Sequence, residues 1–269
     1  MGDMPIEGCG ALRGVREPDV LVPVDETSRE RPPGGVVHPL VVAHERAGAR
    51  GVFDIAFTSL PLGLGGVAPL TTLVTAGAGP ITECVSLRDP ALLPIGPGEA
   101  PAGYFVLFTC EREGMPSIVR AVRTNSDLGA LTFIPEPVLT PTSLGNGFAE
   151  RGVYGADGVA FFDEAGSVTY RLWFMARDRS ERSTIGFAEG SGPRGMLPAF
   201  RGYVANPVLV ETDAVLGDCP IGRCALESVA VARWAADATH VRLLVTRQIQ
   251  EAGMATRYVM VPLDQVWPR

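Results

Sequence analysis

The hydrophobic positions of the chain fall into short runs that recur in a fixed order. Over 88–140 the runs are RDPALLPI, GYFVLFTCE, PSIVRAVRTN and PEPVLTP, and over 155–211 they are GADGVAFFDE, TYRLWFMARD, STIGFAEGS and ANPVLVE. In both stretches an acid opens the first run, aromatic residues crowd the second, and Pro-Val-Leu marks the fourth. Apolar runs of this length between turns rich in glycine and proline indicate β-strands, so each stretch predicts a unit of four strands.

Two further copies of this unit flank the first two. Residues 225–264 carry three of the runs (ALESVAVARW, HVRLLVTRQ and ATRYVMVPLD), and 38–87 carry a weaker copy (HPLVVAHE, GVFDIAFTSL, APLTTLVTAG and PITECVSL). Repeated four-stranded units are typical of the blades of a β-propeller, because a single blade cannot bury both of its faces. A β-sandwich built from similar short strands is the alternative, and the repeated order of the runs favours the propeller.

The sequence therefore predicts an all-β chain that forms one β-propeller domain over 1–269. Its parts are an N-terminal strand and connector over 1–35 and blades at about 36–87, 88–140, 155–211 and 224–266. The last copy is one strand short, so we expect Val20–Val24 to pair with the strand that contains Tyr258–Val261 and to close the ring, because closure removes open sheet edges. The alternative is that the first 25 residues are the remnant of a fifth blade.

The second and third copies resemble a known superfamily. RDPALL and GYFVLFTCE, followed by GADGVAFF, YRLWFMARD, STIGFAEGSG and NPVL, are similar to the five-bladed propeller glycoside hydrolases. That superfamily comprises arabinanases and xylosidases of family 43 together with invertase-like and phosphorylase relatives. The resemblance covers about 88–211 well, 225–264 weakly and the first 87 residues poorly.

The resemblance implies a central funnel with three carboxylates from successive blades, in the order Asp, Asp, Glu. Asp89, Asp157 and Glu227 occur in this order, each at the start of the first strand of a copy. By analogy Asp89 is the general base or nucleophile, Asp157 orients and tunes its neighbours, and Glu227 is the general acid. Glycoside hydrolysis needs one protonated and one ionised carboxyl group on opposite faces of the sugar ring, and a third acid raises the pKa of the proton donor.

Each of the three acids also has a purely structural interpretation. Asp89 precedes a proline and Asp157 precedes a glycine, and both settings are common in turns. Glu227 heads an apolar strand, where burial of an unpaired carboxylate is destabilising. A non-catalytic propeller that binds glycans or proteins, or serves as a scaffold, is therefore the alternative to a glycoside hydrolase.

Three further residues are candidates for substrate binding. His38 opens the first copy, where it could contact a sugar or an axial ion, although a buried, hydrogen-bonded histidine is the alternative. Arg88 could bind a hydroxyl or carboxylate of the substrate or pair with an acid of the chain, and Trp234 could contact a sugar. Apart from the axial ion, no cofactor and no metal are expected. Alternation within the strands predicts blade packing, and not sugar binding, for the aromatic residues Phe105, Phe108, Trp173 and Phe174.

Composition narrows the function further. All 23 basic residues are arginine, so Schiff-base chemistry and a phosphate-loop lysine are excluded. The net charge of -7 and the pI near 5.1 argue against nucleic acid or an anionic membrane as the main partner. The carbohydrate ligand that we expect is an implication of the resemblance. No apolar run approaches the roughly 18 residues that a membrane span needs. The N-terminus MGDMPIEGCGALRG has no signal-peptide pattern, and the chain is expected to be extracellular or periplasmic.

The cysteines bear on this localisation. Cys219 and Cys224 bracket the short loop DCPIGRC, so a local disulfide is expected, with inert thiols or a zinc pair as the alternatives. Cys84 lies near a turn and Cys110 ends an apolar run, and both are expected to be reduced or separately buried.

Overall fold

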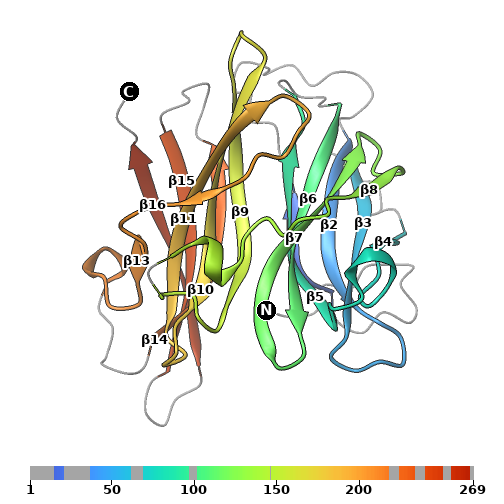
Figure 1. Cartoon of the computed structure of the whole chain (residues 1–269). Helices are drawn as coiled ribbons and strands as arrows, with labels where there is room; N and C mark the ends of the chain where they lie inside the picture. The colour runs from blue at the N-terminus through green and yellow to red at the C-terminus, as the bar shows by residue number, and fades with distance from the viewer. Residues whose placement is uncertain are drawn as a thin grey trace. The chain divides into compact units, whose positions relative to one another are not determined.

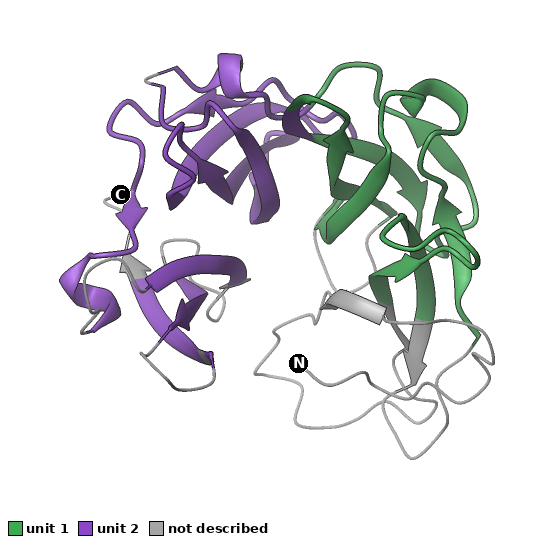
Figure 2. Ribbon diagram, turned by 90° about the horizontal axis from the view of Figure 1, so that it is seen from below, with its two compact units in different colours: residues 1–115, 119–137 green, residues 116–118, 138–269 purple. Residues whose placement is uncertain are grey.

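The computed structural model describes residues 15–20, 37–61, 69–96, 102–145, 147–217, 224–233, 240–250 and 256–266. These residues form strands β1 to β16 and three one-turn 3-10 helices, so the predicted all-β class is confirmed (Figure 1). The chain divides into two compact units (Figure 2). Unit 1 contains residues 1–115 and 119–137, and unit 2 contains residues 116–118 and 138–269.

Unit 1 contains two antiparallel sheets in which neighbouring strands are consecutive in sequence. The first sheet has the order β1 (Val15–Val20), β2 (Val37–Glu45), β3 (Phe53–Pro61) and β4 (Thr71–Val74). The second has the order β5 (Ser86–Pro94), β6 (Gly103–Arg112), β7 (Met115–Asn125) and β8 (Leu131–Phe133). The helix η1 (Gly79–Ile81) lies between the two sheets in sequence.

Unit 2 repeats the same plan. Its first sheet contains β9 (Gly152–Phe162), β10 (Ser167–Arg177) and β11 (Ser183–Pro193), and two short strands, β12 (Arg201–Gly202) and β13 (Leu209–Val210), share the fourth position. The second sheet contains β14 (Cys224–Arg233), β15 (His240–Ile249) and β16 (Arg257–Val266). Helices η2 (Pro141–Ser143) and η3 (Ala214–Leu216) precede the first and second sheets in sequence. Residues 116–118 of β7 belong to unit 2, and Ser117 pairs in parallel with Gly152.

The Asn-Pro-Val-Leu motif bridges the gap between β12 and β13. The backbone N–H of Phe187 donates to Asn206 Oδ1 at 2.8 Å, and Asn206 Nδ2 donates to the carbonyl oxygen of Phe187 at 2.9 Å. The amide of Asn206 therefore replaces the backbone groups that a continuous fourth strand would offer to β11. Asn206 is buried, so these two hydrogen bonds satisfy polar groups that water does not reach.

The cores consist of the aromatic and branched residues of the middle strands. Phe105, Phe108, Trp173 and Phe174 are fully buried, which confirms that they are blade packing. In unit 2 the first sheet packs on the second through one cluster, in which Trp173 and Phe187 lie with ring centroids 5.0 Å apart. The buried members of this cluster are Val159, Trp173, Met175, Ile185, Phe187, Leu216, Leu226, Val229, Val241, Leu243 and Val245.

Two strands of the predicted copies lie elsewhere. The run PITECVSL was expected to be the fourth strand of the first copy, but it contains the end of η1, and β5 begins within it at Ser86. The fourth strand of the second copy was expected in PEPVLTP and is β8, which lies just before it. Pro135 and Pro137 have no backbone N–H to donate to β7, which is why the pairing falls on the residues that precede them.

The expected ring closure by the N-terminal strand is wrong. β1 pairs antiparallel with β2, with Val20 opposite Leu40, and so completes the first sheet of unit 1. The described part of Tyr258–Val261 lies on β16, which pairs with β15. Residues 21–24 lie outside the described part of the chain. The error arose because the first copy was predicted to begin at the strand that contains His38, which is β2. The sheet begins one strand earlier, at β1, which pairs with β2.

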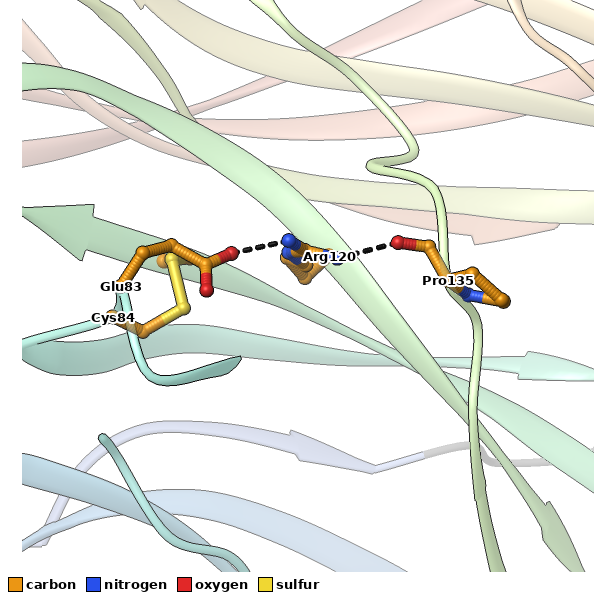
Figure 3. The surroundings of a disulfide bond; sticks show 5 residues. Glu83, Cys84, Arg120 and Pro135 are labelled. Atoms are coloured by element: carbon orange, nitrogen blue, oxygen red, sulfur yellow. Dashed lines mark hydrogen bonds and ion pairs between the residues drawn. A yellow bond between two sulfur atoms is a disulfide. The ribbon is translucent and has the colours of Figure 1, made fainter. Parts of the chain in front are cut away.

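The expectation that Cys84 and Cys110 stay separate is also wrong, because they form a disulfide (Figure 3). The bond ties the turn before β5 to β6 across a sequence separation of 26, and both residues are fully buried. Beside it, Arg120 pairs with Glu83 and donates from Nη1 to the carbonyl oxygen of Pro135 at 2.8 Å. Nothing local in the sequence indicated this pairing, because the two cysteines meet only when β5 and β6 pair.

Cys224 is disulfide-bonded as well. Its predicted partner, Cys219, lies outside the described residues, so the local loop disulfide stays a prediction. Within the described ranges, no helix has the length and apolar character to cross a membrane.

Candidate functional site

The three predicted catalytic acids lie at or beside an irregular point of a first strand. β5, β9 and β14 are each the first strand of a sheet, and in each the pairing with the second strand shifts register at the acid. The shift lies between Arg88 and Ala91 around Asp89, and between Leu226 and Ser228 around Glu227. In β9 it lies between Tyr154 and Asp157. Asp89 and Glu227 lie inside their bulges, whereas Asp157 lies at the end of the bulge of β9, opposite Trp173 of β10. Because a β-bulge redirects side chains from the regular alternation of a strand, Asp89 and Glu227 occupy positions suited to a site.

Asp89 lies in a left-handed backbone conformation, with φ of 48°. Aspartate tolerates this region better than most residues, although the conformation is rare outside glycine. Its half-buried carboxylate accepts a hydrogen bond from Thr109 Oγ1, on β6, at 2.7 Å. Thr109 is only 1% exposed, so this donor is fixed in the core beneath the bulge.

Asp157 uses its carboxylate to join the two sheets of unit 2. Oδ1 accepts the backbone N–H of Gly158 at 2.6 Å, and Oδ2 accepts the backbone N–H of Val231, on β14, at 2.6 Å. A Cβ atom on residue 158 would lie 2.2 Å from the carbonyl oxygen of Arg171, which explains why glycine follows this aspartate. The carboxylate therefore satisfies a backbone N–H of the strand that carries Glu227.

Glu227 differs from the other two acids because it is exposed. Its neighbours Leu226 and Val229 point into the core, at 1% and 6% exposure. The bulge between Leu226 and Ser228 therefore lets Glu227 leave the apolar strand without burial of its charge, which resolves the desolvation problem posed by the sequence. The strands of Asp157 and Glu227 lie together in unit 2, and Asp89 belongs to unit 1.

Arg88, one of the predicted substrate-binding residues, contacts other side chains of unit 1. Arg88 pairs through Nε with Glu111 Oε1 at 2.9 Å, and its guanidinium lies 4.7 Å from the ring centroid of Phe53. The ion pair with an acid of the chain, which was the alternative to substrate binding, is therefore present. A role of Arg88 in substrate binding stays a prediction. Trp234 lies outside the described residues.

The assignment of His38 to the start of the first blade is wrong. His38 lies on β2, opposite Leu60 of β3, and the first strand of that sheet is β1. The axial ion expected near His38 stays a prediction. Among the described residues, the atoms of Glu83, Cys84 and Cys110 are close enough to hold a metal ion, but the two sulfurs are bonded to each other and offer no thiolate.

Glu17 was not among the predicted site residues, and it occupies in β1 the position that Asp89 occupies in β5. β1 contains Arg16-Glu17-Pro18 and β5 contains Arg88-Asp89-Pro90. The pairing of β1 with β2 shifts register between Arg16 and Asp19, as that of β5 with β6 does at Arg88. The shared sequence Arg-acid-Pro could have identified Glu17. It was overlooked because the first copy was predicted to begin after β1.

Comparison with known proteins was made by sequence and by structure. No family model and no curated protein matches the sequence. Among solved structures, the chain is similar to xylan beta-1,4-xylosidase from Bacillus halodurans C-125, with 10% identity and a TM-score of 0.57 over 99% of this chain and 44% of that one. It is similar to a thermostable family-43 glycoside hydrolase, with 15% identity and a TM-score of 0.50 over 87% and 73%. The GH43 BlXynB protein from Bacillus licheniformis matches with 12% identity and a TM-score of 0.51 over 93% and 40%.

These likenesses show the fold. The chain has the β-propeller fold of the family-43 glycoside hydrolases, as the order of its runs predicted, and the sheets described above are its blades. The chain spans less than half the length of the xylosidase and of BlXynB.

Proposed function

We propose that this protein is a glycoside hydrolase that acts on a furanoside-type or related glycan through carboxylates on the first strands of its blades. The observation that carries the proposal is an acid inside a bulge of the first strand at Asp89 and Glu227, and an acid at the end of such a bulge at Asp157. Blade packing alone requires no carboxylate at this point of every sheet. The shared fold with family-43 enzymes supports the same conclusion.

The surroundings of the acids suggest how the roles divide. Asp89 accepts a hydrogen bond from Thr109, and such a bond favours the ionised form that a general base or nucleophile needs. Glu227 is exposed, as suits a residue that meets a leaving group, so we assign it as general acid. Asp157 holds β14 in place through Val231. Glu17 is a second candidate for the base or nucleophile, because it repeats the setting of Asp89.

The test is a hydrolysis assay on aryl arabinofuranosides, aryl xylosides and fructosides. We expect Glu227→Gln and either Asp89→Asn or Glu17→Gln to lower kcat/KM by about 10²- to 10⁴-fold, the usual contribution of an acid or base. Because Glu227 is exposed, its amide variant should keep the melting temperature of the wild type.

Glu113→Gln is the matched control, because Glu113 is an exposed acid in the turn between β6 and β7, away from the bulges. It should leave both activity and melting temperature unchanged. Hydrolysis by the wild type that survives in all the bulge variants would overturn the proposal.

A non-catalytic glycan- or protein-binding propeller is the second candidate. It is favoured by Asp157 and Arg88, whose charged groups contact a backbone N–H of β14 and the carboxylate of Glu111. Binding of arabinan or xylan oligosaccharides by calorimetry, without turnover of any of the aryl glycosides, would identify this function.

We also propose that the protein works outside the reducing cytoplasm. The buried Cys84–Cys110 disulfide and the disulfide-bonded Cys224 support this, because disulfides persist mainly in oxidising compartments.

A further inference from the structure

The pair formed by Thr109 and Asp89 has a geometry that packing does not explain. Thr109 lies on β6 opposite Arg88, at the last regular pair before the register shift in β5. Its hydroxyl is buried in the core and reaches the carboxylate of the bulge residue at 2.7 Å. Asp89 lies in a conformation with φ of 48°, and residues in such sparsely populated conformations occur preferentially at functional sites.

Another buried threonine of unit 1 shows what a structural hydroxyl does. Thr124, on β7, is 3% exposed and donates through Oγ1 to the carbonyl oxygen of Tyr104 at 3.3 Å. That bond links two strands of one sheet. The bond from Thr109 instead serves a side chain that the bulge has removed from the regular sheet.

Two of the acids on the strands packed against β5 are themselves paired. Glu111, two residues beyond Thr109, binds Arg88, and Asp54, on β3, binds Arg46 through Oδ2 at 2.9 Å. The other titratable groups on these strands are Arg16, Glu17 and Asp19 on β1, His38, His44 and Glu45 on β2, and Tyr104 and Arg112 on β6.

We propose that Thr109 is the positioning residue of the site: its buried hydroxyl fixes the side chain of Asp89 in one orientation and keeps it in the charged form that a base or nucleophile requires. This inference rests on the proposed function for its catalytic meaning. The hydrogen-bond effect itself can be measured whether or not the protein turns over a substrate.

The experiment compares Thr109→Val, Thr109→Ser and the matched control Thr124→Val in the full chain. In protein with ¹³C-labelled aspartate, the carboxyl resonance of Asp89 is assigned by its loss in Asp89→Asn and followed by NMR between pH 2.5 and 8, a range that covers carboxyl titration. Loss of a hydrogen bond to the charged form makes that form less stable. We expect the midpoint for Asp89 to rise by about one pH unit in Thr109→Val and to stay at the wild-type value in Thr109→Ser and Thr124→Val.

Activity provides the second readout. The acid limb of the kcat/KM profile should move upward by the same amount in Thr109→Val and return in Thr109→Ser, with about tenfold lower kcat/KM on that limb. An unchanged Asp89 midpoint in Thr109→Val overturns the inference, as does an equal shift in Thr124→Val. A normal rate in Asp89→Asn overturns instead the catalytic role of Asp89, and an unfolded Thr109→Val protein leaves Thr109→Ser and Thr109→Ala to decide by the same titration.

Discussion

Units 1 and 2 hold their acid-bearing first strands in different ways. In unit 1 the disulfide between Cys84 and Cys110 ties the start of β5 to β6, and the carboxylate of Asp89 is bound by the side chain of Thr109. In unit 2 the carboxylate of Asp157 is itself the tie, because it accepts the backbone N–H of Val231 on the next sheet. An acid at or beside the bulge of a first strand is therefore held by a side chain in unit 1, whereas in unit 2 it holds the neighbouring sheet.

This difference indicates that sequence equivalence within a repeat does not imply equivalence of role. A bulge in a first strand contains an acid in both units, at Asp89 in unit 1 and at Glu227 in unit 2, and Asp157 lies beside a third bulge. What the carboxylate then does depends on whether a side chain or a backbone N–H of the neighbouring sheet lies within its reach.

The largest effect is expected from removal of the disulfide of unit 1. Replacing Cys84 and Cys110 together by serine should lower the free energy of unfolding by about 3 kcal/mol, because the unfolded chain gains the freedom that the closed loop removes. Hydrogen exchange should rise first in β5 and β6 and remain low in β9 and β14. Equal protection of β5 in the variant and the wild type would show that the disulfide does not hold this strand.

A matched pair of substitutions tests the two carboxylates directly. Asp157→Asn places an amide N–H₂ group against one of two backbone N–H donors, and the resulting unsatisfied group should lower stability by about 2 kcal/mol. Asp89→Asn can still accept from Thr109 through its amide oxygen, so its loss should be below about 1 kcal/mol. Chemical denaturation measures both.

Exchange of the Val231 amide proton locates the effect of Asp157→Asn. It should accelerate in that variant and stay slow in Asp89→Asn. Equal losses of stability in the two variants would remove the distinction between the units.

The smallest expected effect concerns pH, and it has opposite signs in the two units. In unit 1, burial lowers the pKa of His44 below 6.5, against the opposing effect of Asp54, so its contribution is complete above pH 6.5 and is lost as the pH falls. In unit 2, burial raises the pKa of Glu211 above 4.5, with Arg182 opposing, so its contribution is present below pH 4.5 and is lost as the pH rises.

Thermal unfolding of His44→Leu and Glu211→Gln between pH 4 and 8 measures these contributions. Relative to the wild type, His44→Leu should gain stability as the pH falls below 6.5, and Glu211→Gln should gain stability as the pH rises above 4.5. Parallel curves for a variant and the wild type would contradict the corresponding prediction.

The sequence by itself determined the strand class, the repeated order of the runs and the presence of the three acids on first strands, although each acid lies within its strand and not at the start. These are local properties: the lengths of apolar runs, the turn residues between them and the spacing of the copies. They sufficed to predict the propeller fold, and the burial of Phe105, Phe108, Trp173 and Phe174.

Only the tertiary structure decided the partners. Cys84 bonds to Cys110, Asp157 accepts a hydrogen bond from Val231, and β1 pairs with β2. These contacts form when separate strands pair and pack, and no local sequence pattern specifies which strand edges will pair. The phase of the first copy was hidden for the same reason: an apolar run predicts a strand but carries no information about its place in the sheet. The partners in turn give each acid its role, since the chemistry of a carboxylate depends on the donors that surround it.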